Sequence, residues 1–109
     1  EKVDFITTPG YIDGPGSRER WGLPANTGPE CIITNKAVLK FNKITGEAFL
    51  ESYHPGNSVE EILEHTPWEL KVSGDVHETK PPTGEELRVL HEILDPHHMI
   101  AIYEKRGYI

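Results

Sequence analysis

The sequence predicts an α/β fold, a layered arrangement of a mixed sheet that carries an antiparallel hairpin and two capped helices. Three observations support this prediction. Short strand-like runs alternate with helix-like runs, two of the strand-like runs flank a hairpin-type loop, and both helix-like runs begin with capping residues. The order of elements does not fix the order of strands in the sheet. All 109 residues are expected to form a single domain.

The first quarter of the chain is predicted to be a strand followed by an irregular loop. Residues 1–6 contain a strand-like run that ends at Pro9-Gly10, where proline removes a ladder donor and glycine permits a turn. Residues 7–29 contain five glycines and four prolines, too irregular a composition for helix or sheet. We expect this loop to lack hydrogen bonds of its own and to be ordered by a partner surface.

Residues 31–53 are predicted to form strands at 31–34, 37–41 and 48–53. The last two strands pair antiparallel across a loop in which Gly46 suits a left-handed position. Alternation places Ala37, Leu39 and Phe41 on one face. Cys31 opens an apolar run, and we expect it to be a buried, reduced thiol.

Two helices are predicted, at residues 58–66 and 83–94, each with a capping box at its start. The boxes are Ser58 with Glu61 and Thr83 with Glu86. A short strand at residues 68–72 would lie between the helices. Apolar residues fall on one face of the second helix, and we therefore expect one broad side of this helix to be packed against other residues.

Composition excludes several classes of function. The net charge is −7, and no large cluster of lysine and arginine interrupts the acidic chain, so neither nucleic acid nor an anionic membrane is expected as a partner. No apolar run approaches the roughly 20 residues that a membrane span requires, and the N-terminus has no signal-peptide pattern. We therefore expect a cytoplasmic protein.

The sequence offers no metal site and no catalytic residue. His91, His97 and His98 are close in sequence, but they lack the spacing or the cysteines that complete a metal site. No serine–histidine–acid or cysteine–histidine arrangement follows from spacing. The acidic residues at the predicted helix starts are explained by capping and by the helix dipole.

Five residues are candidates for binding substrate or a partner: Tyr11, Arg18, Arg20, Trp21 and His54. The two arginines lie beside an aromatic in a loop where no regular element requires them, and arginine pairs bidentately with carboxylate or phosphate. His54 precedes a predicted helix start, which attracts anions. The alternatives are solvated loop charges for the arginines and, for His54, a turn histidine bonded to the local backbone.

Three segments together resemble the C-terminal part of the B subunit of the family I CoA-transferases, of the glutaconate CoA-transferase type. They are VDFITTPGYIDGPGSRERWGLPANTGPECIITNKAVLKF at residues 3–41, LESYHPGNSVEEILEHTPWELKV at 50–72 and PPTGEELRVLHEILDP at 81–96. The resemblance covers about residues 3–96. It implies the CoA-transferase fold, of which this chain would form a part.

The resemblance also implies a function. The family moves CoA between an acyl-CoA and a carboxylic acid, through a glutamate that attacks the thioester, with coenzyme A as substrate and no covalently bound cofactor. That glutamate lies in a Ser-Glu-Asn-Gly motif, and neither this motif nor the family's Gly-rich segment occurs here. The chain is thus expected to supply scaffold or binding surface, together with the family's A subunit or the N-terminal half of the B subunit, and to be inactive alone.

Two alternatives to a CoA-transferase component remain. One is a non-catalytic assembly or binding domain derived from such a subunit. The other is a component of a related acyl-CoA hydrolase or ring-opening enzyme.

Overall fold

The computed structural model describes residues 7, 8 and 10–99, which fall in two compact units that divide between Thr79 and Lys80. The predicted strand at residues 1–6 lies outside the described residues. That the chain is one domain stays a prediction.

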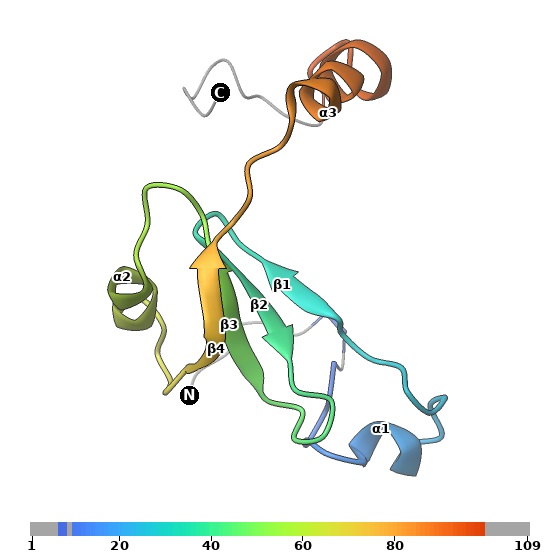
Figure 1. Ribbon diagram of the computed structural model, residues 1–109. Helices are drawn as coiled ribbons and strands as arrows, with labels where there is room; N and C mark the ends of the chain where they lie inside the picture. The colour runs from blue at the N-terminus through green and yellow to red at the C-terminus, as the bar shows by residue number, and fades with distance from the viewer. Residues whose placement is uncertain (1–6, 9, 100–109) are drawn as a thin grey trace. The chain divides into compact units, whose positions relative to one another are not determined.

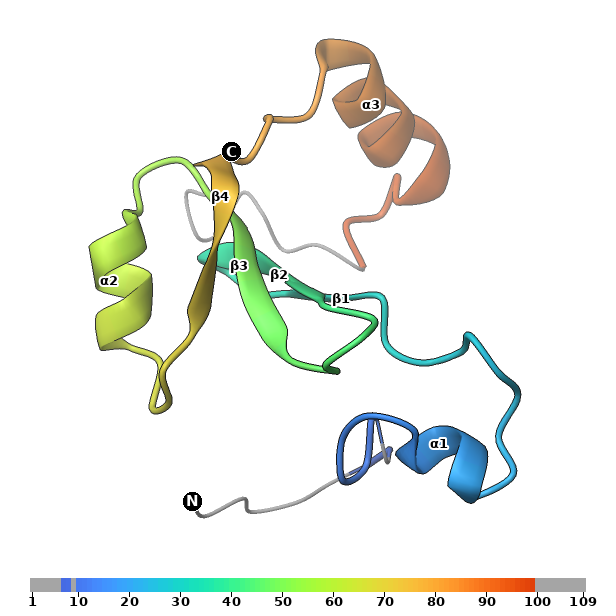
Figure 2. The same ribbon diagram turned by 60° about the horizontal axis from the view of Figure 1, so that its bottom comes forward.

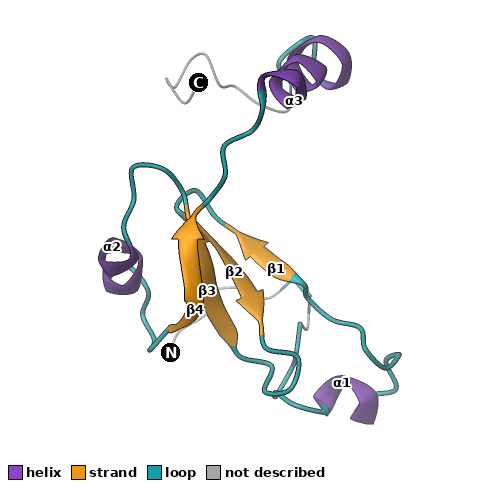
Figure 3. Ribbon diagram, in the orientation of Figure 1, coloured by secondary structure: helices purple, strands orange, loops and turns teal. Residues whose placement is uncertain are grey.

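The first unit contains most of the secondary structure (Figures 1 and 3). Its elements are α1 (Ser17–Arg20), β1 (Cys31–Ile33), β2 (Ala37–Phe41), β3 (Ala48–Tyr53), α2 (Val59–Glu64) and β4 (Lys71–Glu78). The second unit contains α3 (Gly84–Val89), which continues directly into the π-helical segment η1 (Leu90–Leu94).

The sheet is mixed, as predicted. Its strand order is β1-β2-β3-β4, with β1, β2 and β3 antiparallel and β4 parallel to β3. The hairpin register pairs Ala37 with Tyr53 and Phe41 with Ala48. In its loop the Asn42 side chain accepts from the amides of Ile44 and Thr45, which stabilises the turn. The α/β class and the antiparallel hairpin are therefore confirmed.

The core lies on the side of the sheet that α2 covers. Its buried apolar residues are Ala37, Leu39, Leu50, Ile62 and Leu70. Leu39 pairs with Leu50 across β2 and β3, and Ile62 of α2 belongs to the same cluster. As predicted, Ala37 and Leu39 share the inner face, with Phe41 half-buried. This small cluster holds the β3-α2-β4 crossover together.

The predicted strand at residues 68–72 is placed wrongly, because β4 begins at Lys71 and extends to Glu78. Leu70 is buried in the core, whereas Trp68 is half exposed. Residues 73–75 are Ser-Gly-Asp, which strand propensity disfavours. β4 pairs with β3 at its two ends, with Lys71 and Val72 opposite Phe49 and Leu50, and with His77 and Glu78 opposite Ser52 and Tyr53. The register shifts between these two ends, where residues 73–76 have no register partner in β3.

Cys31 is exposed, so the expectation of a buried thiol is wrong. The reason is the position of β1 at the edge of the sheet, where all three of its residues are exposed. Ile33 is 72% exposed. An apolar run on an edge strand has no covering layer among the residues that the structure describes.

The two helix starts differ. Thr83 and Glu86 form the complete capping box of α3, in which each side chain bonds the other's backbone amide. In α2 the Ser58 hydroxyl accepts from the Glu61 amide, while the Glu61 carboxylate pairs chiefly with Lys36 and interacts only weakly with the backbone of Ser58. The box predicted at Ser58 is thus half formed.

The second predicted helix is α-helical only to Val89. From Leu90 the chain is a π-helix, closed by a bond of 2.7 Å from the Asp95 amide to the Leu90 carbonyl. No residue of α3 or η1 is buried by the described part of the chain, and Leu94 is 65% exposed. Packing of the apolar side therefore stays a prediction.

Candidate functional site

The loop at residues 10–30 folds beside the turn of the β2-β3 hairpin (Figure 2). It has hydrogen bonds of its own, contrary to expectation. The Gly14 amide donates to Tyr11 O at 3.0 Å, and the Leu23 amide donates to Arg18 O at 2.9 Å. The expectation overlooked local turns and the short helix α1, which is capped by Gly16 with φ 72°. The loop satisfies part of its backbone without a partner.

Tyr11 anchors this loop to the hairpin. Its hydroxyl donates to Pro29 O at 3.0 Å, and its ring centroid lies 5.1 Å from that of Phe41 in β2. The backbone of Gly28 passes so close that a Cβ there would lie 2.9 Å from the Tyr11 ring. The ring is therefore enclosed by the loop and the sheet together.

Arg18 and Arg20 are held by neutral oxygens rather than by carboxylates. Arg18 donates from Nη1 to Gly10 O at 2.6 Å and from Nη2 to Thr27 Oγ1 at 3.3 Å. Its Nε is shielded from solvent and has no hydrogen-bond partner in the described part of the chain. Arg20 donates to Pro15 O and to the buried hydroxyl of Ser17. Both guanidinium groups thus brace the loop.

A pocket of about 100 Å³ opens in this loop. Its lining comes from the loop and from the hairpin turn: Tyr11, Gly14, Pro15, Gly16, Arg18, Glu19, Asn26, Thr27, Gly28, Glu30, Lys43 and Gly46. Sequence reasoning found Tyr11 and Arg18 but missed Thr27 and Lys43. Lys43 resembles an ordinary turn residue, and only the docking of the loop on the hairpin brings it to the pocket.

Trp21 and Arg20 are not in the pocket lining. Trp21 follows α1 and is 74% exposed. An indole with this exposure contributes little to the packing of its own unit. It is therefore available to a partner surface.

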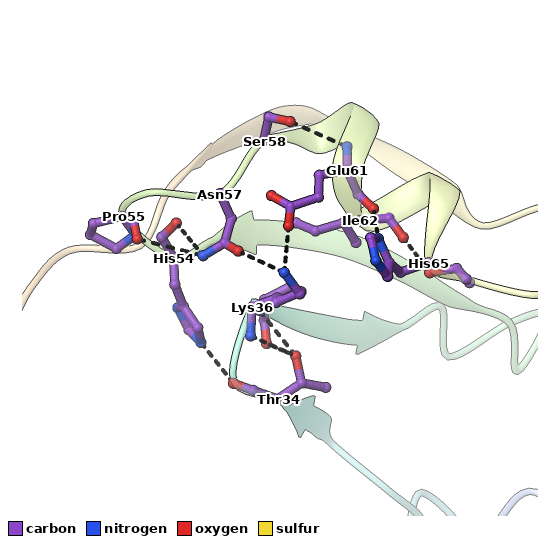
Figure 4. Close-up of polar contacts among 11 residues, drawn as sticks. Thr34, Lys36, His54, Pro55, Asn57, Ser58, Glu61, Ile62 and His65 are labelled. Carbon is purple, nitrogen blue, oxygen red and sulfur yellow. Dashed lines mark hydrogen bonds and ion pairs between the residues drawn. The ribbon is translucent and has the colours of Figure 1, made fainter. Parts of the chain in front are cut away.

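His54 lies at the other end of β3, in a separate polar network (Figure 4). Its Nε2 donates to Thr34 O at 2.9 Å, because a carbonyl can only accept. In the neutral ring Nδ1 then accepts from the Thr79 hydroxyl, also at 2.9 Å. Both ring nitrogens are occupied, which favours the structural role of a turn histidine.

Lys36 and Glu61 complete this network (Figure 4). Sequence reasoning missed Lys36 and assigned Glu61 only to the capping of α2. Lys36 Nζ donates to Glu61 Oε1 and to Asn57 Oδ1, which joins the corner between β1 and β2 to the start of α2. The hydrogen bond and charge of Lys36 lower the pKa of Glu61. Because the folded pKa is lowered, the stabilisation is present at neutral pH and is lost as the pH falls through that pKa.

Other classes of site find no support in the described residues. No group of three or more histidine, cysteine, aspartate or glutamate side chains there could hold a metal ion. Among the same residues, no helix has the length and apolar character needed to cross a membrane.

Comparison with known proteins gives related chains but no matching family model. The B subunit of glutaconate CoA-transferase from Acidaminococcus fermentans is 43% identical over 95 residues, which cover 87% of this chain and 35% of the relative. The B subunit of 3-oxoadipate CoA-transferase from Pseudomonas knackmussii is 36% identical over 83% of this chain and 34% of its own length. The IpdB subunit of the cholesterol ring-cleaving hydrolase from Rhodococcus jostii is 32% identical over 60% of this chain and 26% of its own length.

A solved structure has the same fold. The crystal structure of glutaconate coenzyme A-transferase from Acidaminococcus fermentans superposes with a TM-score of 0.76 at 39% identity, covering 90% of this chain and 37% of that one. The chain spans about a third of the length of the two CoA-transferase relatives. In sequence and in fold, the chain is therefore related to a segment of the CoA-transferase B subunit of the glutaconate type.

Proposed function

We propose that this chain is part of a CoA-transferase that moves CoA between an acyl-CoA and a carboxylic acid, and that it supplies scaffold and binding surface rather than the nucleophile. One observation carries the proposal: the fold matches glutaconate coenzyme A-transferase with a TM-score of 0.76 at 39% identity. At 39% identity the two chains are similar in sequence as well as in fold. We place the segment in the C-terminal part of a B subunit, in the cytoplasm.

Three of the four carboxylates in the first turns of α2 and α3 support a non-catalytic role. A nucleophilic glutamate must be free to attack a thioester. Glu61 is engaged by Lys36, Glu85 by Arg88 and Glu86 by the backbone of Thr83, and these contacts lower the pKa of all three. Carboxylates that are held in this way have a structural role. The attacking glutamate would come from outside these residues.

The 109-residue chain alone is expected to show no CoA transfer. Acetyl-CoA would be incubated with dicarboxylic and 3-oxo acids, first with this chain and then with the complete B subunit that carries it, together with its A-type partner. We expect new acyl-CoA only with the complex, because the chain lacks the Ser-Glu-Asn-Gly motif. A thioester trapped on a glutamate of this chain would refute the non-catalytic role, and an inactive complex would refute the CoA-transferase.

The loop at residues 7–29 is proposed to face a partner, either the A-type polypeptide or the remainder of the B-type one, near the acyl-CoA site. Trp21 is 74% exposed, and the neighbouring edge strand β1 exposes Ile32 and Ile33. Exposed aromatic and aliphatic side chains of this kind are typical anchors of interfaces.

Hydrogen exchange would test the partner-facing loop. Amides of residues 16–22 are expected to exchange more slowly in the complex than in the chain alone, because burial against the partner suppresses opening. Amides of β3, already within the sheet, serve as the control and should change little. Equal exchange of residues 16–22 in both samples would exclude this loop from the interface.

A second candidate function is a hydrolase or ring-opening enzyme, which the similarity to the cholesterol ring-cleaving hydrolase favours. The two functions differ in what accepts the acyl group. A transferase needs an acceptor acid, whereas a hydrolase uses water. Consumption of an acyl-CoA thioester or ring substrate by the complex without any acceptor acid would favour the hydrolase. A complex that assembles but is inactive in both assays would favour the non-catalytic binding domain.

A further inference from the structure

We propose that His54 is the latch of a pH-sensitive clasp at the end of β4. With a neutral ring, His54 ties Thr79, the last residue of the first unit, to the corner between β1 and β2. When the ring is protonated, the clasp weakens and the end of β4 opens locally. This device belongs to the first unit itself and does not depend on the transfer activity proposed above.

The segment that the clasp holds has few backbone contacts. Beyond the register shift, β4 pairs with β3 through two residues, His77 and Glu78. Thr79 adds one backbone hydrogen bond, from its amide to Tyr53 O at 2.7 Å. A strand end with so few ladder bonds opens at low cost in free energy, so the side-chain contacts of Thr79 contribute much of its order.

The hydrogen bonds of the clasp all run in one direction. His54 Nε2 donates to Thr34 O at 2.9 Å, because a carbonyl oxygen can only accept (Figure 4). A neutral ring then has no hydrogen on Nδ1, which accepts from the Thr79 hydroxyl at 2.9 Å. Thr79 Oγ1 in turn accepts from the Ser52 hydroxyl, also at 2.9 Å. Each of these three donors therefore has an acceptor.

Protonation of His54 adds a donor to this chain of bonds and removes an acceptor. The hydrogen on Nδ1 would point at Thr79 Oγ1, and the Thr79 hydroxyl hydrogen would have to turn away from the ring. The hydroxyls of Ser52 and Thr79 can form one hydrogen bond with each other, so one of their two hydrogens then lacks an acceptor among the described residues. Ser52 is 4% exposed and Thr79 is half-buried, so solvent is a poor substitute. The surplus donor weakens the clasp.

The other charged and titratable groups on the elements around His54 respond differently to acid. They are Lys36 at the corner between β1 and β2, Glu61 and His65 of α2 and its C-cap, and His77 and Glu78 of β4. The charges of Lys36 and Glu61 offset each other in an ion pair. His65 and His77 each donate from Nδ1 to a backbone carbonyl, and they can do so whether the ring is neutral or protonated.

The clasp should contribute fully at neutral pH and weaken in mild acid. A histidine in an unfolded chain takes up a proton near about pH 6.5. Because the folded clasp disfavours the protonated ring, its contribution to stability declines as the pH falls below that value. The ion pair of Glu61 is lost at lower pH, since the hydrogen bond and charge of Lys36 hold the pKa of Glu61 below its ordinary value. The two effects therefore occur in separate pH ranges.

NMR of the ¹⁵N-labelled full chain tests the resting state of the clasp. Couplings within the imidazole ring distinguish its two neutral tautomers. At about pH 7.5 we expect the hydrogen of His54 on Nε2, with Nδ1 as an acceptor. A hydrogen on Nδ1 at that pH would overturn the proposal, because Thr79 could not then be the donor.

Amide hydrogen exchange at about pH 7.5 and at about pH 5.5 tests the opening. After correction for the intrinsic pH dependence of exchange, protection of the Thr79 amide should fall about tenfold at the lower pH, the effect of one unsatisfied donor. The Asn42 amide, which bonds Glu47 O in the loop between β2 and β3, is the control and should keep its protection. Equal protection of Thr79 at both pH values would refute the clasp.

Substitutions identify the group that titrates. His54→Asn cannot take up a proton, but it keeps a hydrogen-bonding atom near the position of Nδ1. In this variant the tenfold pH effect at Thr79 should disappear. His77→Gln removes a neighbouring histidine of β4 and is the matched control, in which the effect should persist. A pH effect that survives in His54→Asn would mean that another group opens the end of β4. The two measurements on the unmodified chain do not require either variant to fold.

Discussion

Replacing Leu50 with alanine is expected to lower the free energy of unfolding of the first unit by about 2–5 kcal/mol. Leu50 is 0% exposed and lies in β3, paired with Leu39 on one side and with Val72 on the other. The substitution removes buried methyl groups and leaves a cavity. The flanking strands β2 and β4 are hydrogen-bonded to β3 and therefore cannot move in to fill it. Since the buried apolar cluster in the described residues is small, the loss is a large fraction of the total stability.

Urea unfolding of the full chain, followed by circular dichroism and by tryptophan fluorescence, would measure this effect. Ile44→Ala is the matched control, because Ile44 lies in the hairpin turn and is 85% exposed. Its expected cost is within about 0.5 kcal/mol. Similar midpoints for the two variants would mean that β3 does not lie at the centre of the core.

Local features of the fold could be predicted from the sequence because their signals are local. The hairpin follows from alternation in two neighbouring strands, with Gly46 at φ 70° in the loop. The capping box follows from Thr83 and Glu86, three residues apart. Each depends on residues that are close in the chain, so tertiary context has little opportunity to override the prediction.

Features set by long-range pairing could not be predicted. The strand β4 contains Gly74 and Asp75, and it exists because β3 offers a parallel edge. The exposure of Cys31 depends on the strand order, which places β1 at an edge. Nothing in a run of three apolar residues distinguishes an edge strand from a central one.

The candidate site was predicted in part for the same reason. Arg18 stands out in the sequence as a cation in an irregular loop, but its neutral partners Gly10 and Thr27 lie eight and nine residues away. Lys43 reaches the pocket only because Tyr11 docks the loop on the hairpin. From the sequence, His54 is a candidate for binding an anion. In the structure both of its ring nitrogens are hydrogen-bonded within the chain, to Thr34 and Thr79, which favours a structural role.

Gly28→Ala is expected to destabilise the folded loop by about 2–4 kcal/mol. Two effects add. The backbone of Gly28 has φ 144°, which an L side chain rarely adopts, and the new methyl group would lie 2.9 Å from Cε1 of Tyr11. The Tyr11 ring cannot yield freely, because its hydroxyl bonds Pro29 O and its face meets Phe41.

Amide exchange at Gly14, whose N–H bonds Tyr11 O, would report the local opening of the loop. Gly22→Ala separates strain from clash, because Gly22 has φ 79° but its added Cβ meets nothing within 4 Å. That change should cost about 1–2 kcal/mol. In a Tyr11→Ala background Gly28→Ala should fall to the same cost, which gives a coupling of about 1–2 kcal/mol between the two positions. Additive effects of Tyr11→Ala and Gly28→Ala would instead mean that the ring does not enclose the backbone of Gly28. Other contacts would then hold the loop against the hairpin.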